Sequence, residues 1–389
     1  MRCFFIEPEW CNGLQWIGNS RTSIKAVQMT LSCGLVGLPG CGKTTIFNAV
    51  TAAGAGCFDG SEMNRAVINV PDPRLDRLVE MYRPRKVVPA TVEVVDIPGL
   101  RAGSTVGEGR GARLLGHIKD VDALLHVVRC FEDETVLSEY AGIDPGRDVE
   151  TVELELVVAD SQTLQNKIER LQKKSKAGDQ EVIREKQECE KVKAGLEEGI
   201  PARKQILTES ELASIRECNL LSIKPVLYIA NIKSLEDESN APVKTLQSIA
   251  DAEGAEMIAV CGRDEAEIAQ LEPEEQGEFL NELGLEESSM QRLIRAAYRL
   301  LGLVSFFTTG SDEVRAWTCH HGDMAPVAAG KIHTDMERGF IRMEVIRFDD
   351  LAELGSEAAV ARAGRQRLEG KNYEVQDGDI VTIRFSPPK

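Results

Sequence analysis

The stretch GLVGLPGCGKTT, Gly34–Thr45, decides the fold of this chain. The pattern GxxxxGK[ST] of a phosphate-binding loop is satisfied by four of its residues, Gly37, Gly42, Lys43 and Thr44. The apolar run 31–37 predicts a buried strand before the loop, and residues 43–53 predict a helix after it. A glycine-rich turn between a strand and a helix directs backbone N–H groups and the positive helix N-terminus at phosphate oxygens.

The residue types in this loop point to a nucleoside triphosphate with Mg²⁺. Lys43 is long enough to reach the β- and γ-phosphates, and we assign it a catalytic role. The hydroxyl of Thr44 is suited to ligate Mg²⁺. We therefore expect the nucleotide to contact the loop residues Gly37, Gly40, Cys41, Gly42, Lys43, Thr44 and Thr45.

A second stretch, VVDIPGL, continues the same chemistry at the end of another β-rich run. A carboxylate at the position of Asp96 holds Mg²⁺ in phosphoryl-transfer enzymes, and the N–H of Gly99 can sense the γ-phosphate. Leu100 follows, where many GTPases place a glutamine that orients the attacking water. Because leucine cannot do this, we expect slow hydrolysis unless another group or a partner assists.

Short apolar strands alternate with helical segments along much of the chain, which indicates an α/β fold with a parallel sheet. Further strands are expected within 88–99, 121–131, 225–231 and 256–262. The charged segment 151–218 interrupts this pattern and predicts an inserted antiparallel helical hairpin with a break at residues 178–180. Basic residues gather near the break, and they are either a solvated face or a contact for RNA phosphates: Lys167, Arg170, Lys173, Lys174 and Lys176.

The pattern of expected strands and helices divides the chain into five parts. Residues 1–28 have neither a long apolar core nor a small-residue cleavage site, and we interpret them as a non-native or disordered extension before Met29. The nucleotide-binding domain is expected to occupy 29–150 and 219–302, on either side of the hairpin 151–218. Residues 303–389 read as a separate small β-rich domain.

Composition excludes several classes of protein. No apolar run approaches the ~20 residues that span a bilayer, so we expect a cytoplasmic protein without a membrane partner. The net charge of −17 opposes DNA binding. The charge is unevenly distributed, because the segment between Asp251 and Glu287 has thirteen acidic residues and one basic residue, and the remainder of the chain is near neutral. Ten cysteines without CxxC spacing read as buried thiols, except that an exposed Cys41 thiol could be oxidised and block the nucleotide.

The chain resembles the Obg-like ATPase family, also called YchF. The resemblance rests on GLPGCGKTT, on the long stretches 95–133 and 293–342, and on PVLYIAN and YEVQDGDIV, and it spans Met29 to Lys389. It implies a P-loop domain with an inserted coiled-coil hairpin and a C-terminal TGS domain, which is a β-grasp module. It also implies slow hydrolysis of ATP, often preferred over GTP, and association with ribosomal RNA or protein.

The resemblance adds two statements about individual residues. A hydrophobic residue in place of the catalytic glutamine is a trait of the family, which Leu100 fits. The family's histidine, a suggested catalytic contributor, corresponds to His126 in HVVRCF. Because His126 lies in an apolar strand, it reads equally well as a histidine of the core.

Three positions depart from the family. The loop Gly40–Thr44 replaces the usual NVGKS but keeps its chemistry. The segment before VPDPRL is short and lacks the threonine that completes the Mg²⁺ shell, for which Ser61 is a weak substitute. The family's base-recognition motif NxxE reads Asn231-Ile232-Lys233-Ser234 here, and Glu236 lies two positions too far along the chain.

The last departure bears on the base. Guanine-specific enzymes use NKxD, whose carboxylate accepts from two N–H groups of guanine, whereas this chain has no acid at the fourth position. A site without it loses roughly 2–4 kcal/mol of preference for guanine, because a charged hydrogen bond contributes ~1.5–3 kcal/mol. We expect ATP or poor discrimination, with Asn231 and Ile232 flanking the base. The alternatives are a nucleotide-gated binding module with vestigial hydrolysis and a GTP-using enzyme.

Overall fold

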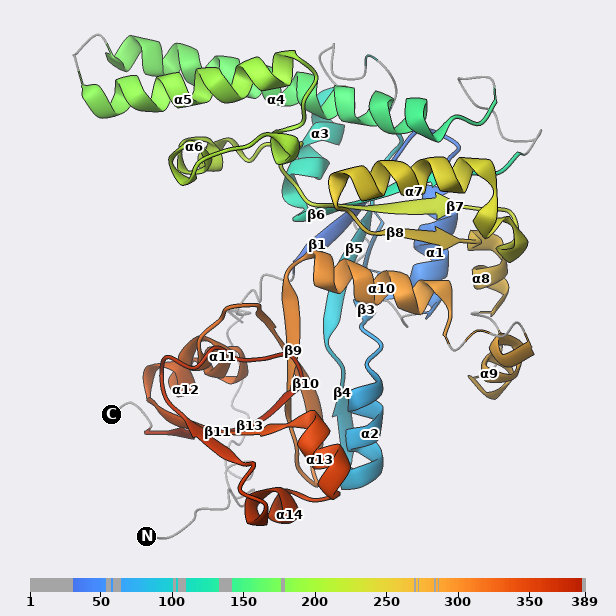
Figure 1. Cartoon of the computed structure of the whole chain (residues 1–389), viewed down its shortest axis with the longest axis vertical. Coiled ribbons are helices and arrows are strands. Elements are labelled where there is room, and N and C mark those ends of the chain that lie inside the picture. The colour runs from blue at the N-terminus through green and yellow to red at the C-terminus, as the bar shows by residue number, and fades with distance from the viewer. Residues whose placement is uncertain are drawn as a thin grey trace, which may run out of the picture. The chain divides into compact units, whose positions relative to one another are not determined.

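A computed structural model of the chain is shown in Figure 1. It describes residues 31–53, 57–58, 64–100, 103, 110–132, 142–175, 179–268, 271, 273–282, 285 and 287–386. The chain divides into two units, Met1–Thr30 and Leu31–Lys389, and the described residues all belong to the second. The expectations for residues 1–28, Ser61 and Lys176 lie outside the described residues.

The first of two sheets carries the predicted nucleotide-binding domain. Its order is β2-β3-β5-β1-β6-β7-β8, in which β5, β1, β6, β7 and β8 are parallel and β3 and β2 continue the sheet antiparallel. The strands are β1 Ser32–Val36, β2 Cys57–Phe58, β3 Arg65–Asn69, β5 Thr91–Asp96, β6 Ala123–Arg129, β7 Val226–Asn231 and β8 Met257–Val260. The predicted α/β fold with a parallel sheet is confirmed.

Helices cover both faces of this sheet, which explains why β1, β6 and β7 are buried along their whole length. On one face, α1 (Lys43–Ala53) and α10 (Ser289–Leu300) pack against alternate strand residues such as Leu35. The opposite face carries α3 (Arg110–Asp120), the start of α4 (Pro145–Ser175) and α7 (Ala241–Glu253), which pack on Leu124 and Val128.

The inserted antiparallel helical hairpin is present as predicted. Helix α4 starts at Pro145, and α5 (Gln180–Glu197) begins after Asp179, whose carboxylate caps it by accepting from the N–H of Glu181. The two helices run side by side (Figure 1). The hairpin has a core of its own, formed by Val157, Leu164, Ile168, Leu171, Cys189, Val192, Leu196, Ala202, Ile215, Cys218 and Leu220.

Several shorter helices connect the hairpin to the sheet and complete its far edge. Between α5 and β7 lie η2 (Ala202–Lys204), α6 (Glu209–Ile215) and η3 (Arg216–Cys218). After β7 the chain continues through η4 (Leu235–Ser239), α8 (Gly262–Ile268) and α9 (Pro273–Glu282). None of the helices in the described ranges is both long enough and apolar enough to cross a membrane.

The second sheet contains the C-terminal β-grasp. Its order is β12-β11-β13-β9-β10-β4, with the strands β4 Lys86–Val88, β9 Leu303–Thr308, β10 Glu313–His320, β11 Phe340–Arg347, β12 Arg367–Glu369 and β13 Asp379–Phe385. Helix α11 (Ala325–Ile332) packs its alanines against Phe306, Met343 and Val345. The remaining helices are α2 Pro73–Tyr82, α12 Thr334–Arg338, α13 Phe348–Leu354 and α14 Glu357–Arg362.

The strand β4 was not expected in this sheet. It comes from the first part of the chain and pairs in parallel with β10, Lys86 opposite Glu313. The core beneath α10 also continues without a break into the second sheet through Phe307 and Val314. A boundary at residue 303 therefore separates segments that share one apolar core.

Candidate nucleotide-binding site

The phosphate loop lies between β1 and α1, as its sequence predicts, and its backbone leaves no room for side chains at two glycines. A Cβ on Gly37 would lie 2.4 Å from the carbonyl oxygen of Val127, and one on Gly42 would lie 2.1 Å from Nδ2 of Asn231. Both glycines have positive φ, 148° and 96°. The spacing of the motif is therefore a requirement of close approach and backbone conformation.

Lys43 closes the loop onto itself. Its Nζ donates to the carbonyl oxygens of Gly37 at 3.0 Å and Leu38 at 2.9 Å, and the residue is 7% exposed. The loop thus holds a cation at its centre, bonded to two neutral carbonyl groups and to the Cys41 sulfur at 3.7 Å. Such a lysine can turn to a phosphate, because a charge-assisted bond to an anion is stronger than one to a carbonyl.

Thr44 in the first turn of α1 and Asp96 at the end of β5 meet in the site. The Thr44 hydroxyl donates to Oδ2 of Asp96 at 3.1 Å. A hydroxyl and a carboxylate this close, both facing the pocket, form an oxygen donor set of the type that Mg²⁺ prefers. The residues therefore fit the Mg²⁺ ion that the sequence predicts.

The segment after Asp96 packs tightly on the phosphate loop. A Cβ on Gly99 would lie 2.9 Å from the backbone nitrogen of Pro39, and the N–H of Leu100 donates to the Gly37 carbonyl at 3.1 Å. The Leu100 side chain is 1% exposed and belongs to the apolar core. It points away from water, which agrees with the expectation that it orients none.

The loop after β7 supplies the other side of the site. Asn231 Nδ2 donates to the carbonyl oxygen of Cys41 at 2.9 Å, and the Ile232 N–H donates to Val260 at 2.9 Å. The Ser234 hydroxyl accepts from the N–H of Glu236 at 3.3 Å and so begins η4. Ser234 thus caps a short helix at the position where the family has its acid.

These groups line one pocket of about 770 Å³. Its walls contain the expected residues Gly40, Gly42, Lys43, Thr44, Thr45, Asp96, Gly99, Asn231 and Ile232. They also contain residues that the sequence reasoning missed, namely Pro39, Asn64, Ile97, Pro98, Phe131, Lys233 and Arg263. Phe131 and Arg263 each follow the end of a strand neighbouring β7 or β1, which is the signal that could have found them.

Three expected residues are not among those that line the pocket: Gly37, Cys41 and His126. Cys41 is 3% exposed, and burial raises the pKa of its thiol although Lys43 lies nearby. The alternative that the Cys41 thiol is exposed and oxidisable is therefore wrong. The prediction of buried thiols holds for Cys33, Cys41, Cys130, Cys189, Cys218, Cys261 and Cys319.

His126 lies within β6, beside Tyr228 of β7 with 5.6 Å between the ring centroids. Burial lowers its pKa to about 3, with smaller contributions from Arg203 and Lys43. Strand alternation places it on the face of Leu124, which is opposite to the face that α1 covers. This environment is that of a neutral core histidine, and the catalytic role of His126 stays a prediction.

Comparisons with known proteins agree with this geometry. Residues 32–183 match the family model described as a 50S ribosome-binding GTPase, and residues 303–386 match that of the C-terminal region of YchF GTPases, described as a protein of unknown function. A phosphate loop on a parallel sheet and these matches define a P-loop nucleoside triphosphatase.

The relatives narrow this class further. The chain is 46% identical to a ribosome-binding ATPase YchF of Haemophilus ducreyi over 92% of this chain and 100% of the relative. It is 44% identical to that of Bacillus subtilis, with the same two shares, and 40% identical to Obg-like ATPase 1 of Oryza sativa, with 92% of each covered. The YchF GTPase structure of Schizosaccharomyces pombe is 32% identical, with a TM-score of 0.80 and coverage of 96% and 100%. The chain belongs to the YchF family of Obg-like ATPases.

Proposed function

We propose that the chain is a slow, Mg²⁺-dependent ATPase that acts as a switch on the ribosome or a translation factor in the cytoplasm. One observation carries the proposal: Lys43, Thr44, Asp96 and Asn231, which come from three distant segments, line a single pocket above the phosphate loop. The names of the relatives from Haemophilus ducreyi and Bacillus subtilis support both the nucleotide and the ribosome.

The chain's own groups bind and orient the triphosphate. Lys43 exchanges its two carbonyl partners for phosphate oxygens, and the N-terminus of α1 adds its positive end. Thr44 and Asp96 would hold Mg²⁺, which when bound would neutralise negative charge on the triphosphate. Gly99 brings its N–H close to the loop, where it senses the γ-phosphate.

Hydrolysis is slow because the residue after Gly99 offers no group to the attacking water. The Leu100 side chain is buried in the core, so that a partner or another residue must position the water. His126, one strand from the loop, is the candidate that family resemblance suggests. A binding module with vestigial hydrolysis is favoured by the same burial of Leu100.

The base site favours ATP. With Ser234 in place of an acid, the described residues of the pocket offer no carboxylate except Asp96, which faces the phosphates. Guanine therefore loses the acceptor that distinguishes it. Asn231 and Ile232 flank the base from the β7 loop.

Exposed basic residues on α4 support contact with ribosomal RNA. Arg170, Lys173 and Lys174 are exposed near the end of the helix. Lys167 is not available for this contact, because its Nζ pairs with Glu185 at 2.6 Å and donates to the Ser214 carbonyl at 2.5 Å. The expected RNA contact is therefore reduced to the distal part of the basic cluster.

Titration of the full chain with fluorescent ATP and GTP analogues, with and without Mg²⁺, tests the nucleotide. Phosphate release with and without ribosomes then tests the switch. We expect tighter ATP binding, a requirement for Mg²⁺ and turnover that rises with ribosomes. Guanine preference would refute the ATP assignment, and tight ATP binding with background turnover beside ribosomes would favour the binding module.

A further inference from the structure

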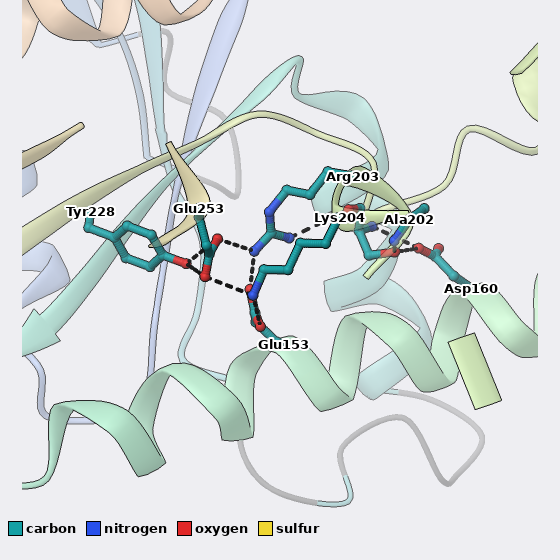
Figure 2. Close-up of polar contacts among 8 residues, drawn as sticks. Glu153, Asp160, Ala202, Arg203, Lys204, Tyr228 and Glu253 are labelled. Carbon is teal, nitrogen blue, oxygen red and sulfur yellow. Dashed lines mark hydrogen bonds and ion pairs between the residues drawn. The ribbon is translucent and has the colours of Figure 1, made fainter. Parts of the chain in front are cut away.

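Four charged side chains form a cluster where the hairpin joins the sheet, and we call them the root quartet: Glu153, Arg203, Lys204 and Glu253 (Figure 2). Lys204 Nζ lies 2.8 Å from Glu153 and 2.7 Å from Glu253. Arg203 pairs with Glu153 and lies 3.4 Å from Glu253. The two cations come from η2, and the two acids come from α4 and α7.

The quartet is held on the hairpin side by a buried carboxylate. Asp160 of α4 is fully buried and accepts from the N–H groups of Leu221 and Ser222 and from the Ser222 hydroxyl at 2.6 Å. Ser222 in turn accepts from the N–H groups of Ala202, through its hydroxyl, and Arg203, through its carbonyl oxygen. Figure 2 shows Asp160 beside Ala202 at the far end of this network. The η2 segment is therefore fixed to α4.

On the sheet side, the quartet ends at Tyr228 of β7. The Tyr228 hydroxyl donates to both carboxylate oxygens of Glu253, at 3.1 and 3.0 Å, and its side chain is completely buried. The ring of Tyr228 lies beside His126, and these two residues share a register row with Val36 of β1. The residue after Val36 is Gly37, the first of the phosphate loop.

We propose that Tyr228 is a positioning residue, which joins the root quartet to His126 and so makes turnover in the phosphate-loop site depend on how the hairpin is held. The quartet is the polar joint, because Arg203 and Lys204 of η2 pair with Glu253 of α7 through charged groups. Tyr228 touches the joint with its hydroxyl and His126 with its ring. This inference rests on the proposed function.

The first test is Tyr228→Phe, which removes one oxygen and keeps the ring. We expect kcat for ATP to fall about fivefold and KM to stay within about twofold, which corresponds to losing a hydrogen bond of about 1 kcal/mol. Unchanged kcat would overturn the inference. The split between kcat and KM separates positioning from a general loss of nucleotide binding.

Tyr298→Phe is the matched control. Tyr298 is also a buried tyrosine, and its hydroxyl donates to Thr318 at 2.9 Å and bonds to Ser305 at 3.1 Å. This variant should lower Tm by an amount similar to Tyr228→Phe but leave kcat unchanged. If both variants lower kcat in proportion to Tm, stability explains the effect and the inference fails.

A readout without nucleotide separates this inference from the proposed function. The chain has five histidines, so His126 can be assigned in an imidazole NMR spectrum by its loss in His126→Gln. Glu253→Gln should move the His126 signals in the wild-type background and leave them in place when residue 228 is Phe. Signals that move equally in both backgrounds overturn the inference. Absent ATP binding with the expected NMR pattern refutes only the proposed function.

Discussion

The phosphate end and the base end of the pocket are built in different ways. The loop of the phosphate end is one continuous segment, Gly37–Thr45, whose central cation Lys43 is 7% exposed, and Asp96 and Gly99 join it from the end of β5. The base end is assembled from the ends of β6, β7 and β8, and the side chain of Arg263 there is 68% exposed. One end is fixed by packing, whereas the other is open to substitution.

This difference indicates which residues of the site can be substituted. A phosphate is the same in every nucleotide, and the loop that holds it has no room for a Cβ at Gly42 and bonds its central Lys43 through two carbonyl oxygens. The base differs between nucleotides, and the loop 231–234 has a serine in place of the family's acid, whose hydroxyl caps η4. Asn231 ties the two ends together through its bond to the Cys41 carbonyl.

The largest effect is expected at the phosphate end. Lys43→Met keeps most of the side chain's length and removes its charge, so ATP affinity should fall about 100-fold, as expected for the loss of about two charged hydrogen bonds. Isothermal titration measures it. Lys86→Met is the control, because Lys86 is an exposed lysine paired with Glu313 at 2.8 Å outside the pocket. An affinity loss below tenfold would contradict the central role of Lys43.

The second prediction concerns His126 of β6, which pairs in register with Val36, the residue before the phosphate loop. Burial, with Arg203 and Lys43 nearby, lowers its pKa from 6.5 to about 3, so the unfolded state binds the proton first as pH falls. The free energy of unfolding therefore loses nothing to His126 above pH 6.5. Between pH 6.5 and pH 3 it falls by up to about 1.4 kcal/mol for each pH unit, because protonation favours the unfolded state.

Urea unfolding at pH 7 and pH 5 tests this sign. The free energy of unfolding should drop more steeply toward pH 5 in the wild-type chain than in His126→Leu. His321→Leu is the control, because His321 is an exposed histidine and should keep the wild-type slope. Equal slopes for all three proteins would show that His126 is protonated alike in the folded and unfolded states.

The contrast between the two ends of the pocket also explains how much of the site could be predicted from the sequence. The phosphate end was predictable because its chemistry lies in two short stretches, Gly37–Thr45 and Asp96–Leu100, each of which has a recognisable pattern. Phe131 and Arg263 were missed because their loops come together only when β6, β7 and β8 pair side by side in the sheet. The pairing of β4 with β10 was missed for a related reason, since 227 residues separate Lys86 from Glu313 and no local pattern records the contact. The start of α4 had a local sign in Pro145, since proline favours the first helical turn.

The third prediction restores the acid at the base end. Ser234→Glu places a carboxylate where the family has one and should shift the ratio of GTP to ATP affinity about tenfold toward GTP, which corresponds to about 1.4 kcal/mol. Ser234→Ala is the matched control, since it removes the hydroxyl that caps η4 and adds no acid. Competition binding measures the ratio. A shift equal in both variants would mean that the cap, and not the charge, matters.

The smallest effect is expected at Arg263. Its guanidinium borders the pocket, and its partner in the described part of the chain is Asp264 at 3.5 Å, so it is an exposed charge near the nucleotide. Arg263→Ala should weaken ATP and GTP alike by about threefold, because exposed charge interactions contribute about 0.2–1 kcal/mol. Arg85→Ala is the control, since Arg85 is an exposed arginine 3.6 Å from Asp312 and away from the pocket. A loss confined to one nucleotide would instead make Arg263 a residue that reads the base, and the base end would then be less open to substitution than its exposure indicates.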